Sequence, residues 1–123
     1  MELDLDNNHA KYQIRAYQPG TIQINDTSYS RSIIVSPDKI LDDWKPQSIS
    51  ELTPDDFTAV SAFNPSILLI GTGSTQQFLS PEIYGDLLNE GIGVEVMGTG
   101  AACRTYNALT AENRNVTAAL LIK

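Results

Sequence analysis

Two stretches of the chain place Gly-Thr-Gly directly after an apolar, β-branched run. Residues 67–75 read ILLIGTGST, and residues 94–102 read VEVMGTGAA. Glycine-rich turns between a strand and a helix hold phosphate groups in dinucleotide-binding proteins, because their backbone N–H groups point at the ligand. The chemistry that these turns suggest is nucleotide or anion binding at Gly71-Thr72-Gly73 and Gly98-Thr99-Gly100.

Neither turn completes a dinucleotide-binding fingerprint. That fingerprint requires a third glycine, a helix that opens at once and an acid after the next strand. The first turn lacks the third glycine, and its helix is expected only from Ser80. The second turn opens a helix, but Cys103 replaces the third glycine and the following strand ends in Lys123. The alternative is structural, since glycines permit sharp turns and close packing of a helix on a sheet.

Cys103 is the only cysteine of the chain and is expected in the first turn of a helix, beside Arg104. A helix N-terminus and a neighbouring cation lower a thiol pKa, so Cys103 could be a nucleophilic or redox thiol. The only histidine, His9, lies in the polar N-terminal segment and offers no nearby base. The small, apolar segment 101–103 favours a buried and inert cysteine instead. We expect no metal site, because one cysteine and one distant histidine form no ligand cluster. We also expect no cofactor, because the sequence holds no complete cofactor-binding motif.

The carboxyl edge of the parallel strands is the place where we expect any ligand, since open α/β sheets bind ligands there. Arg104 is expected either in an ion pair or holding an anion at this edge. No catalytic residue is assigned. The candidate ligand-binding residues are Gly71, Thr72, Gly73, Gly98, Thr99, Gly100, Cys103, Arg104, Tyr106 and Asn107.

Composition and charge indicate a globular protein. The 123 residues are 41% hydrophobic and 19% charged, as is typical of a globular protein. Their number predicts a single α/β domain over 11–123. The polar residues 1–10 predict a flexible tail before it. The formal net charge of −7 disfavours nucleic acid as a partner. The chain has no apolar run near the ~20 residues that span a bilayer, and its acidic start does not resemble a signal peptide. We expect a cytoplasmic protein without membrane insertion and leave the oligomeric state open.

The periodicity of the sequence changes in the middle of the chain. The first part has a period near two, which predicts antiparallel strands over 12–18, 22–25, 29–36 and a short one over 40–44. The second part alternates helices with apolar strands; the helices are expected over 54–63, 80–91 and 100–112, and the strands over 66–70, 93–97 and 116–122. We therefore expect an α/β fold with a mixed sheet: an antiparallel N-terminal part and a parallel β-α-β-α-β C-terminal part.

One signature resembles a known family. The segment ACRTYN (102–107), followed by L…E.R.V.AALL (109–121), is similar to the Mth938-like family of small α/β proteins of unknown function. Its members include a mitochondrial complex I assembly factor and a human adipogenesis-associated domain protein. The resemblance covers about residues 12–122 and implies a three-layer α/β fold around a mixed central sheet.

The resemblance also bears on function. It implies a non-catalytic binding or assembly (chaperone-like) protein with a protein partner, related to respiratory complex I assembly factors. The alternative is small-molecule or anion binding, or thiol chemistry, at the carboxyl edge with the Gly-Thr-Gly turns, Cys103 and Arg104. The chain departs from the family pattern at Gly98, where Asp or Ser is common, and at Asn113, where Gly is common. The first departure puts in doubt any activity that needs a carboxylate at position 98.

Overall fold

The computed structural model describes residues 8–123; residues 1–7, which hold most of the predicted tail, lie outside the described residues. The strands of this part are β1 (Ile14–Gln18), β2 (Thr21–Ile24), β3 (Thr27–Tyr29), β4 (Ile33–Val35), β5 (Ile40–Leu41), β6 (Ile67–Thr72), β7 (Gly93–Met97) and β8 (Val116–Leu121). The helices are α1 (Thr58–Phe63), α2 (Pro81–Asn89) and α3 (Thr99–Ala111), with short 3-10 helices η1 (Ile49–Glu51) and η2 (Pro54–Phe57).

The strands form a central mixed sheet and a smaller antiparallel sheet. The central sheet has the order β5-β4-β8-β6-β7, in which β6 runs parallel to β7 and β8 while β4 runs antiparallel to β8. The second sheet contains β1, β2 and β3. The predicted mixed α/β fold with its antiparallel and parallel parts is confirmed. The parallel strands and their crossover helices follow the predicted order along the chain.

The predicted strand over 29–36 is wrong in one respect, because it is broken between β3 and β4. At the break, the Ser32 N–H and hydroxyl donate to Gln47 Oε1, at 3.2 and 3.3 Å, instead of to a neighbouring strand. The break lets β1–β3 leave the central sheet and form their own.

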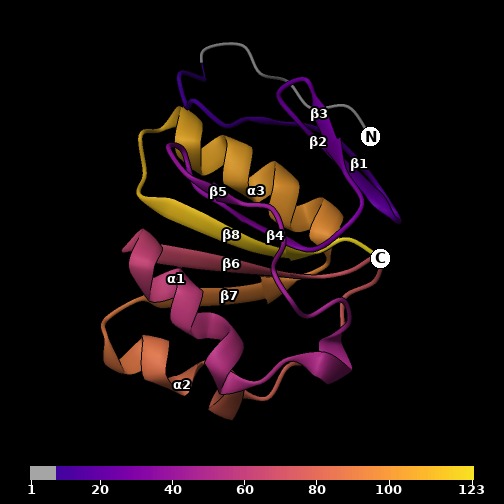
Figure 1. Cartoon of the computed structure of the whole chain (residues 1–123). Helices are drawn as coiled ribbons and strands as arrows, with labels where there is room; N and C mark the ends of the chain where they lie inside the picture. Colours follow the sequence, from indigo (N-terminus) through magenta and orange to yellow (C-terminus); the bar gives the residue numbers. More distant parts are fainter. Residues whose placement is uncertain (1–7) are drawn as a thin grey trace.

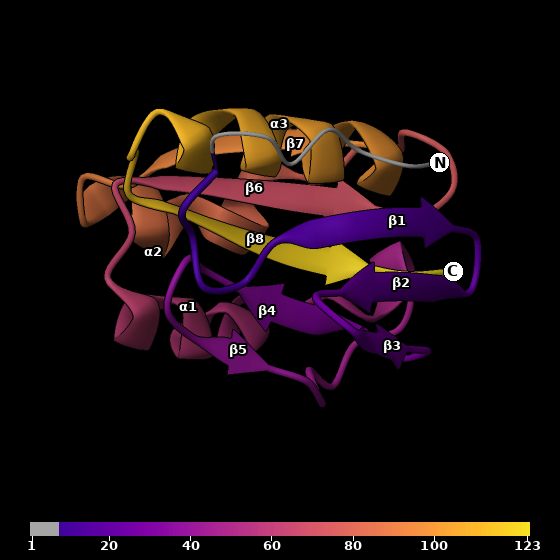
Figure 2. The ribbon, with the colours of Figure 1, turned by 90° about the horizontal axis from the view of Figure 1, so that it is seen from above.

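Three layers result from this arrangement. Figures 1 and 2 place α3 and the β1–β3 sheet on one face of the central sheet, and α1 and α2 on the other. Alternate residues of β8 supply both cores, with Leu120 on the α3 side and Leu121 on the α1 side. Around Leu120 the core gathers Ile14, Tyr17, Ile22, Leu69, Cys103 and Tyr106. Around Leu121 it gathers Trp44, Phe57, Val60, Leu68, Ile70 and Leu87.

The helix α3 is tied to β1 by side-chain hydrogen bonds. The Asn107 amide donates from Nδ2 to the Ile14 carbonyl at 2.7 Å and accepts the Ile14 N–H on Oδ1 at 3.2 Å. The Tyr106 hydroxyl donates to the Tyr12 carbonyl at 2.8 Å. Since Ile14 and Tyr106 are fully buried, these bonds satisfy backbone groups that have no water to pair with.

Asn8, which we expected in the flexible tail, is buried against α3. Its Nδ2 donates to the Asn107 carbonyl at 3.2 Å and to Thr110 Oγ1 at 2.8 Å. Its Oδ1 accepts the Ala10 N–H at 3.0 Å. The chain before β1 is therefore attached to α3 from residue 8 onward.

The segment before α1 adopts a mixed helical form. The predicted helix over 54–63 begins as the 3-10 helix η2 and continues as α1. Asp56 accepts the Thr53 N–H at 2.9 Å, and Asn64, with φ of 51°, ends α1 in the left-handed region. The indole of Trp44 packs edge-on against Phe57 at 5.6 Å between ring centroids and donates Nε1–H to the Asp56 carbonyl at 2.9 Å. Trp44 thus fixes η2 against the sheet.

Replacing Asn107 with Ala should destabilise the protein by about 3 kcal/mol, because the buried N–H and C=O of Ile14 both lose their partner. Urea unfolding, followed by circular dichroism and Trp44 fluorescence, measures the change. The exposed Asn89 serves as a matched control, and its substitution by Ala should change stability by less than ~0.5 kcal/mol. Equal stabilities of the two variants would contradict the role given to Asn107.

Candidate functional site

The two Gly-Thr-Gly turns lie together at one edge of the central sheet, where Thr99 joins them. The Thr99 hydroxyl accepts the Gly73 N–H at 2.9 Å and donates to the Leu121 carbonyl. The Thr99 N–H donates to the Gly73 carbonyl at 2.8 Å. Gly98 occupies the N-cap position of α3, and the Thr99 hydroxyl bonds across the edge.

The glycines of the first turn are required by contacts inside the protein. A Cβ on Gly71 would lie 2.7 Å from Thr99 Oγ1 and 2.9 Å from a methyl group of Leu120. Gly73 has φ of 104°, and a Cβ there would lie 2.6 Å from the Lys123 carbonyl oxygen. Both residues therefore allow the chain to approach itself closely.

Several N–H groups of this edge are already donated within the chain. The Ser74 N–H donates to the Lys123 carbonyl at 2.8 Å. The Thr72 hydroxyl donates to the Thr75 carbonyl at 2.7 Å and accepts the Gln77 N–H at 3.1 Å. Gly98 faces the same loop, since a Cβ there would lie 3.4 Å from the Gln76 nitrogen. A phosphate at the first turn would have to displace these internal bonds.

The other candidate residues lie along α3 and face in different directions. Cys103, Tyr106 and Asn107 are buried under the β1–β3 sheet, whereas Arg104 is exposed and Gly100 is half-buried. Burial raises the pKa of the Cys103 thiol to about 12, with a smaller opposing effect of the Arg104 charge. Burial also raises the pKa of Tyr106, and its hydroxyl is held by the Tyr12 carbonyl.

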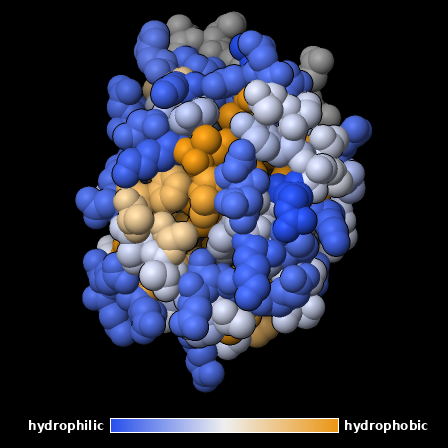
Figure 3. Space-filling view, viewed as in Figure 1, coloured by the Kyte–Doolittle hydropathy of each residue, from blue (hydrophilic) through white to orange (hydrophobic). Residues whose placement is uncertain are grey.

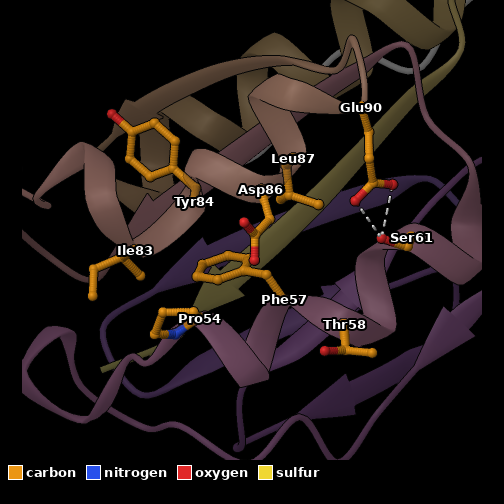
Figure 4. Close-up of a pocket in the computed structure, with 9 residues that line it drawn as sticks. All are labelled: Pro54, Phe57, Thr58, Ser61, Ile83, Tyr84, Asp86, Leu87 and Glu90. Atoms are coloured by element: carbon orange, nitrogen blue, oxygen red, sulfur yellow. Dashed lines mark hydrogen bonds between the residues drawn. The ribbon is translucent and has the colours of Figure 1, made fainter.

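A cleft on the opposite face of the sheet separates η2 and α1 from α2 (Figure 4). Its volume is about 180 Å³. One wall belongs to η2 and α1, and the other wall belongs to α2. The residues that line it are Pro54, Phe57, Thr58, Ser61, Ile83, Tyr84, Asp86, Leu87 and Glu90.

The cleft combines an apolar floor with an acidic rim. Phe57 and Leu87, each 2% exposed, form the floor. The Ser61 hydroxyl hydrogen bonds to both carboxylate oxygens of Glu90, at 3.1 and 3.2 Å, and so connects the two walls (Figure 4). Asp86 is exposed on the same wall as Glu90. The lining contains carboxylates and hydroxyls but no lysine, arginine or histidine.

The size of the cleft limits what it can hold. Pockets for drug-sized molecules and cofactors measure roughly 300–1,000 Å³, well above the 180 Å³ of this cleft. The described residues also contain no group of three acidic, histidine or cysteine side chains placed to hold a metal ion. The cleft therefore has less room than a drug-sized molecule or cofactor usually occupies.

The cleft could not be predicted from the motifs that the sequence offers. Its walls come from segments that start with Thr53-Pro54 and Ser80-Pro81, which predict helices without indicating that these helices pack together. The one available signal was the spacing of Asp86 and Glu90, four residues apart and hence on one helix face.

Apolar surface also gathers next to this region. Figure 3 shows it in the middle of the face, around β5 and α1, with hydrophilic side chains surrounding it. These elements carry the half-buried side chains Ile40, Leu41 and Phe63. No helix in the described part of the chain has the length and hydropathy needed to cross a bilayer.

Comparison with known proteins identifies relatives of the whole chain. It is 31% identical over 122 residues to the 13 kDa major membrane protein of Francisella tularensis, covering 98% of this chain and 99% of that protein. It is 34% identical over 110 residues to NADH dehydrogenase (ubiquinone) 1 alpha subcomplex assembly factor 3 of Danio rerio, covering 88% of this chain. The match spans only 63% of the Danio protein's length.

Solved structures with the same fold are also found among proteins of similar sequence. A crystal structure of a Bordetella parapertussis protein superposes with a TM-score of 0.85 at 38% identity, covering 91% of this chain and 96% of the other. A solution structure from Bordetella pertussis, described as a Mth938-like domain, gives a TM-score of 0.83 at 32% identity, covering 99% and 92%. A family model described as "Protein of unknown function (DUF498/DUF598)" matches residues 14–121. The chain therefore belongs to this DUF498/DUF598 family of Mth938-like proteins.

Proposed function

We propose that this protein is a non-catalytic binding protein that assists the assembly of a respiratory NADH dehydrogenase. The observation that carries the proposal is the 34% identity over 110 residues to the assembly factor 3 protein of Danio rerio. Because the match spans 63% of that relative, the proposal concerns a role that the shared region can perform. The partner would be a subunit or an assembly intermediate of the enzyme.

The use of polar side chains inside the fold supports a binding role. Three of the predicted ligand-binding residues instead hold two segments of the chain together through hydrogen bonds: Thr99, Tyr106 and Asn107. Their chemistry builds a rigid scaffold. A scaffold of this kind can present a preformed surface to a partner, which lowers the entropy lost on association.

The alternative of thiol or anion chemistry at the carboxyl edge gains no specific support. Cys103 is fully buried, and a thiol with a pKa of about 12 is protonated at neutral pH. The N–H groups of Gly73 and Ser74 at the edge already have acceptors within the chain. We therefore retain the assembly role as the function of this protein.

In this role the protein would be in the cytoplasm, where it would meet newly made subunits. It would have no nucleic-acid partner, because its net charge of −7 repels phosphate groups. One relative is named a major membrane protein. An assembly factor that attaches to a membrane-bound intermediate would be found with membranes without spanning them.

Cys103 should resist alkylation in the native protein. With its pKa at about 12 instead of the ordinary 9.0, its thiolate is about a thousandfold scarcer near pH 8 than that of an ordinary cysteine. Iodoacetamide labelling, followed by mass spectrometry, should modify Cys103 only after denaturation. A variant with the exposed Ser74 replaced by Cys serves as control and should label at that position in the native state. Rapid labelling of Cys103 in the native protein would contradict its burial and favour the alternative of thiol chemistry.

Deletion of the gene in the source organism should lower the NADH dehydrogenase activity of its membranes and accumulate partial complexes. Native gels and membrane NADH oxidation measure these two effects, and the full chain supplied in trans should reverse them. Cell fractionation of the same strain locates the protein. Normal amounts of assembled enzyme in the deletion strain would contradict the assembly role.

A further inference from the structure

Acidic residues are concentrated in one segment of the sequence. Between Lys45 and Arg104 the chain has seven acidic side chains and no lysine, arginine or histidine. The rest of the chain balances, since it holds all 8 basic residues and the other 8 of the 15 acidic ones. The net charge of −7 therefore arises from this segment alone. Its acidic residues are Glu51, Asp55, Asp56, Glu82, Asp86, Glu90 and Glu95.

The fold collects most of these charges in one layer. All of them except Glu95 lie on or beside η1, η2 and α2, which cover the same face of the central sheet as α1 (Figure 1). We call η1, η2, α1 and α2 the acidic layer. Five of its acidic side chains are exposed, and Asp56 is half-buried. These exposed carboxylates give the layer a net negative surface, which attracts a partner of opposite sign.

Two of these carboxylates sit where they weaken their own helix. Asp86 lies in the last turn of α2 and Glu90 is its C-cap, and this turn holds no basic residue. The C-terminal end of a helix is negative, so acidic side chains there are unfavourable. Like charges four residues apart also repel. Among residues 8–123 the Asp86 carboxylate has no hydrogen-bond or ion-pair partner that would compensate. Stability alone does not explain this placement.

The cleft beneath these carboxylates has the shape that a long basic side chain needs. Lysine and arginine bury an apolar stem while their charged end stays near the surface. The floor of Phe57 and Leu87 would receive the stem, and Asp86 and Glu90 would face the charge. The hydrogen bond from Ser61 holds the Glu90 carboxylate at the rim.

A second hollow in the acidic layer lacks this complementarity. It measures about 220 Å³ and is lined by Lys45, Pro46, Glu51, Thr53 and Asp56. Lys45 supplies a positive charge beside its two carboxylates, so this hollow offers less attraction to a cation. The cleft between α1 and α2 is the better match for a basic partner.

We propose that this cleft is the docking site for a lysine- or arginine-bearing, otherwise apolar segment of the protein partner. The inference rests on the assembly role proposed above and names the surface that performs it. The charged side chain enters between Asp86 and Glu90, and neighbouring apolar residues of the segment contact Ile83 and the α1 wall. Complementary charge of this kind speeds association and selects the partner.

Replacing Asp86 with Asn and Glu90 with Gln tests the proposal through two opposite effects. The double variant should melt about 3 °C higher, because it loses the repulsion and the unfavourable charges at the end of α2. It should bind about tenfold more weakly to a short, acetylated, alanine-based helical peptide that carries lysine and leucine on one face. Thermal unfolding and an NMR titration of backbone amides measure the two effects.

The titration also locates the binding site. We expect the amide shifts in wild type to concentrate in residues 49–63 and 81–90, to shrink at high ionic strength and to vanish when glutamine replaces lysine in the peptide. The control replaces the exposed Asp26 and Asp42, outside the acidic layer, with Asn and should bind as wild type does. Unchanged affinity of the Asp86/Glu90 variant, or shifts centred elsewhere, would overturn the docking site. The same shifts on concentrating the protein alone would instead assign the cleft to a second copy.

The deletion strain separates this proposal from the assembly role. The Asp86/Glu90 variant should fail to restore NADH dehydrogenase assembly although it is at least as stable as wild type. Full rescue by this variant would overturn the docking site and leave the assembly role standing. A deletion without any phenotype would contradict the assembly role, and the peptide titration would then still decide whether the cleft binds basic segments.

Discussion

The Asn107 side-chain amide both donates to and accepts from the backbone of Ile14. The layer formed by α3 and the β1–β3 sheet depends on these two hydrogen bonds. A strand normally finds both partners in a neighbouring strand. Here a side chain on α3 replaces that neighbour, so the β1–β3 sheet can end against a helix. Both backbone groups of Ile14 are deeply buried, and an unpaired group at that depth would cost about 1–3 kcal/mol.

The same helix is fixed at its other end by Thr99, whose hydroxyl bridges Gly73 and Leu121. Side chains of α3 therefore attach the helix both to the parallel strands and to β1. This explains why the most distinctive segment, ACRTYN, mixes small, aromatic and amide side chains. Ala102, Cys103, Tyr106 and Asn107 pack inward, and Arg104 faces solvent. The side chains of the signature serve mainly to hold α3 in place.

Local sequence patterns predicted most helices and strands, but not how all of the strands assemble into sheets. Turn residues and apolar runs located β6, β7, β8 and the helices between them, because those signals depend on nearby residues. Asn113, where the family commonly has Gly, has φ of 61° and so adopts the left-handed conformation typical after a helix C-terminus. The separation of β1–β3 into their own sheet was not visible, because alternation with a period of two is the same in either sheet.

The candidate site shows the same limit of local reasoning. Gly71 and Gly73 correctly indicated a close approach of backbone, but sequence could not tell whether a ligand or the chain itself approaches. The structure places Thr99 and Lys123 beside these glycines. The cleft brings Phe57 and Ser61 together with Leu87 and Glu90, residues about thirty positions apart in the chain. No spacing rule connects such residues, since they come together only when η2 packs against α2 on the sheet.

The central claim is that partners meet the acidic layer and that the Gly-Thr-Gly edge is internal structure. Hydrogen–deuterium exchange of the protein bound to the proposed NADH dehydrogenase partner, compared with the free protein, tests this claim most directly. The account predicts new protection in residues 49–63 and 81–90, with little change in residues 71–78 and 98–104. Protection confined to residues 71–78 and 98–104 would contradict it and return the function to the carboxyl edge of the sheet.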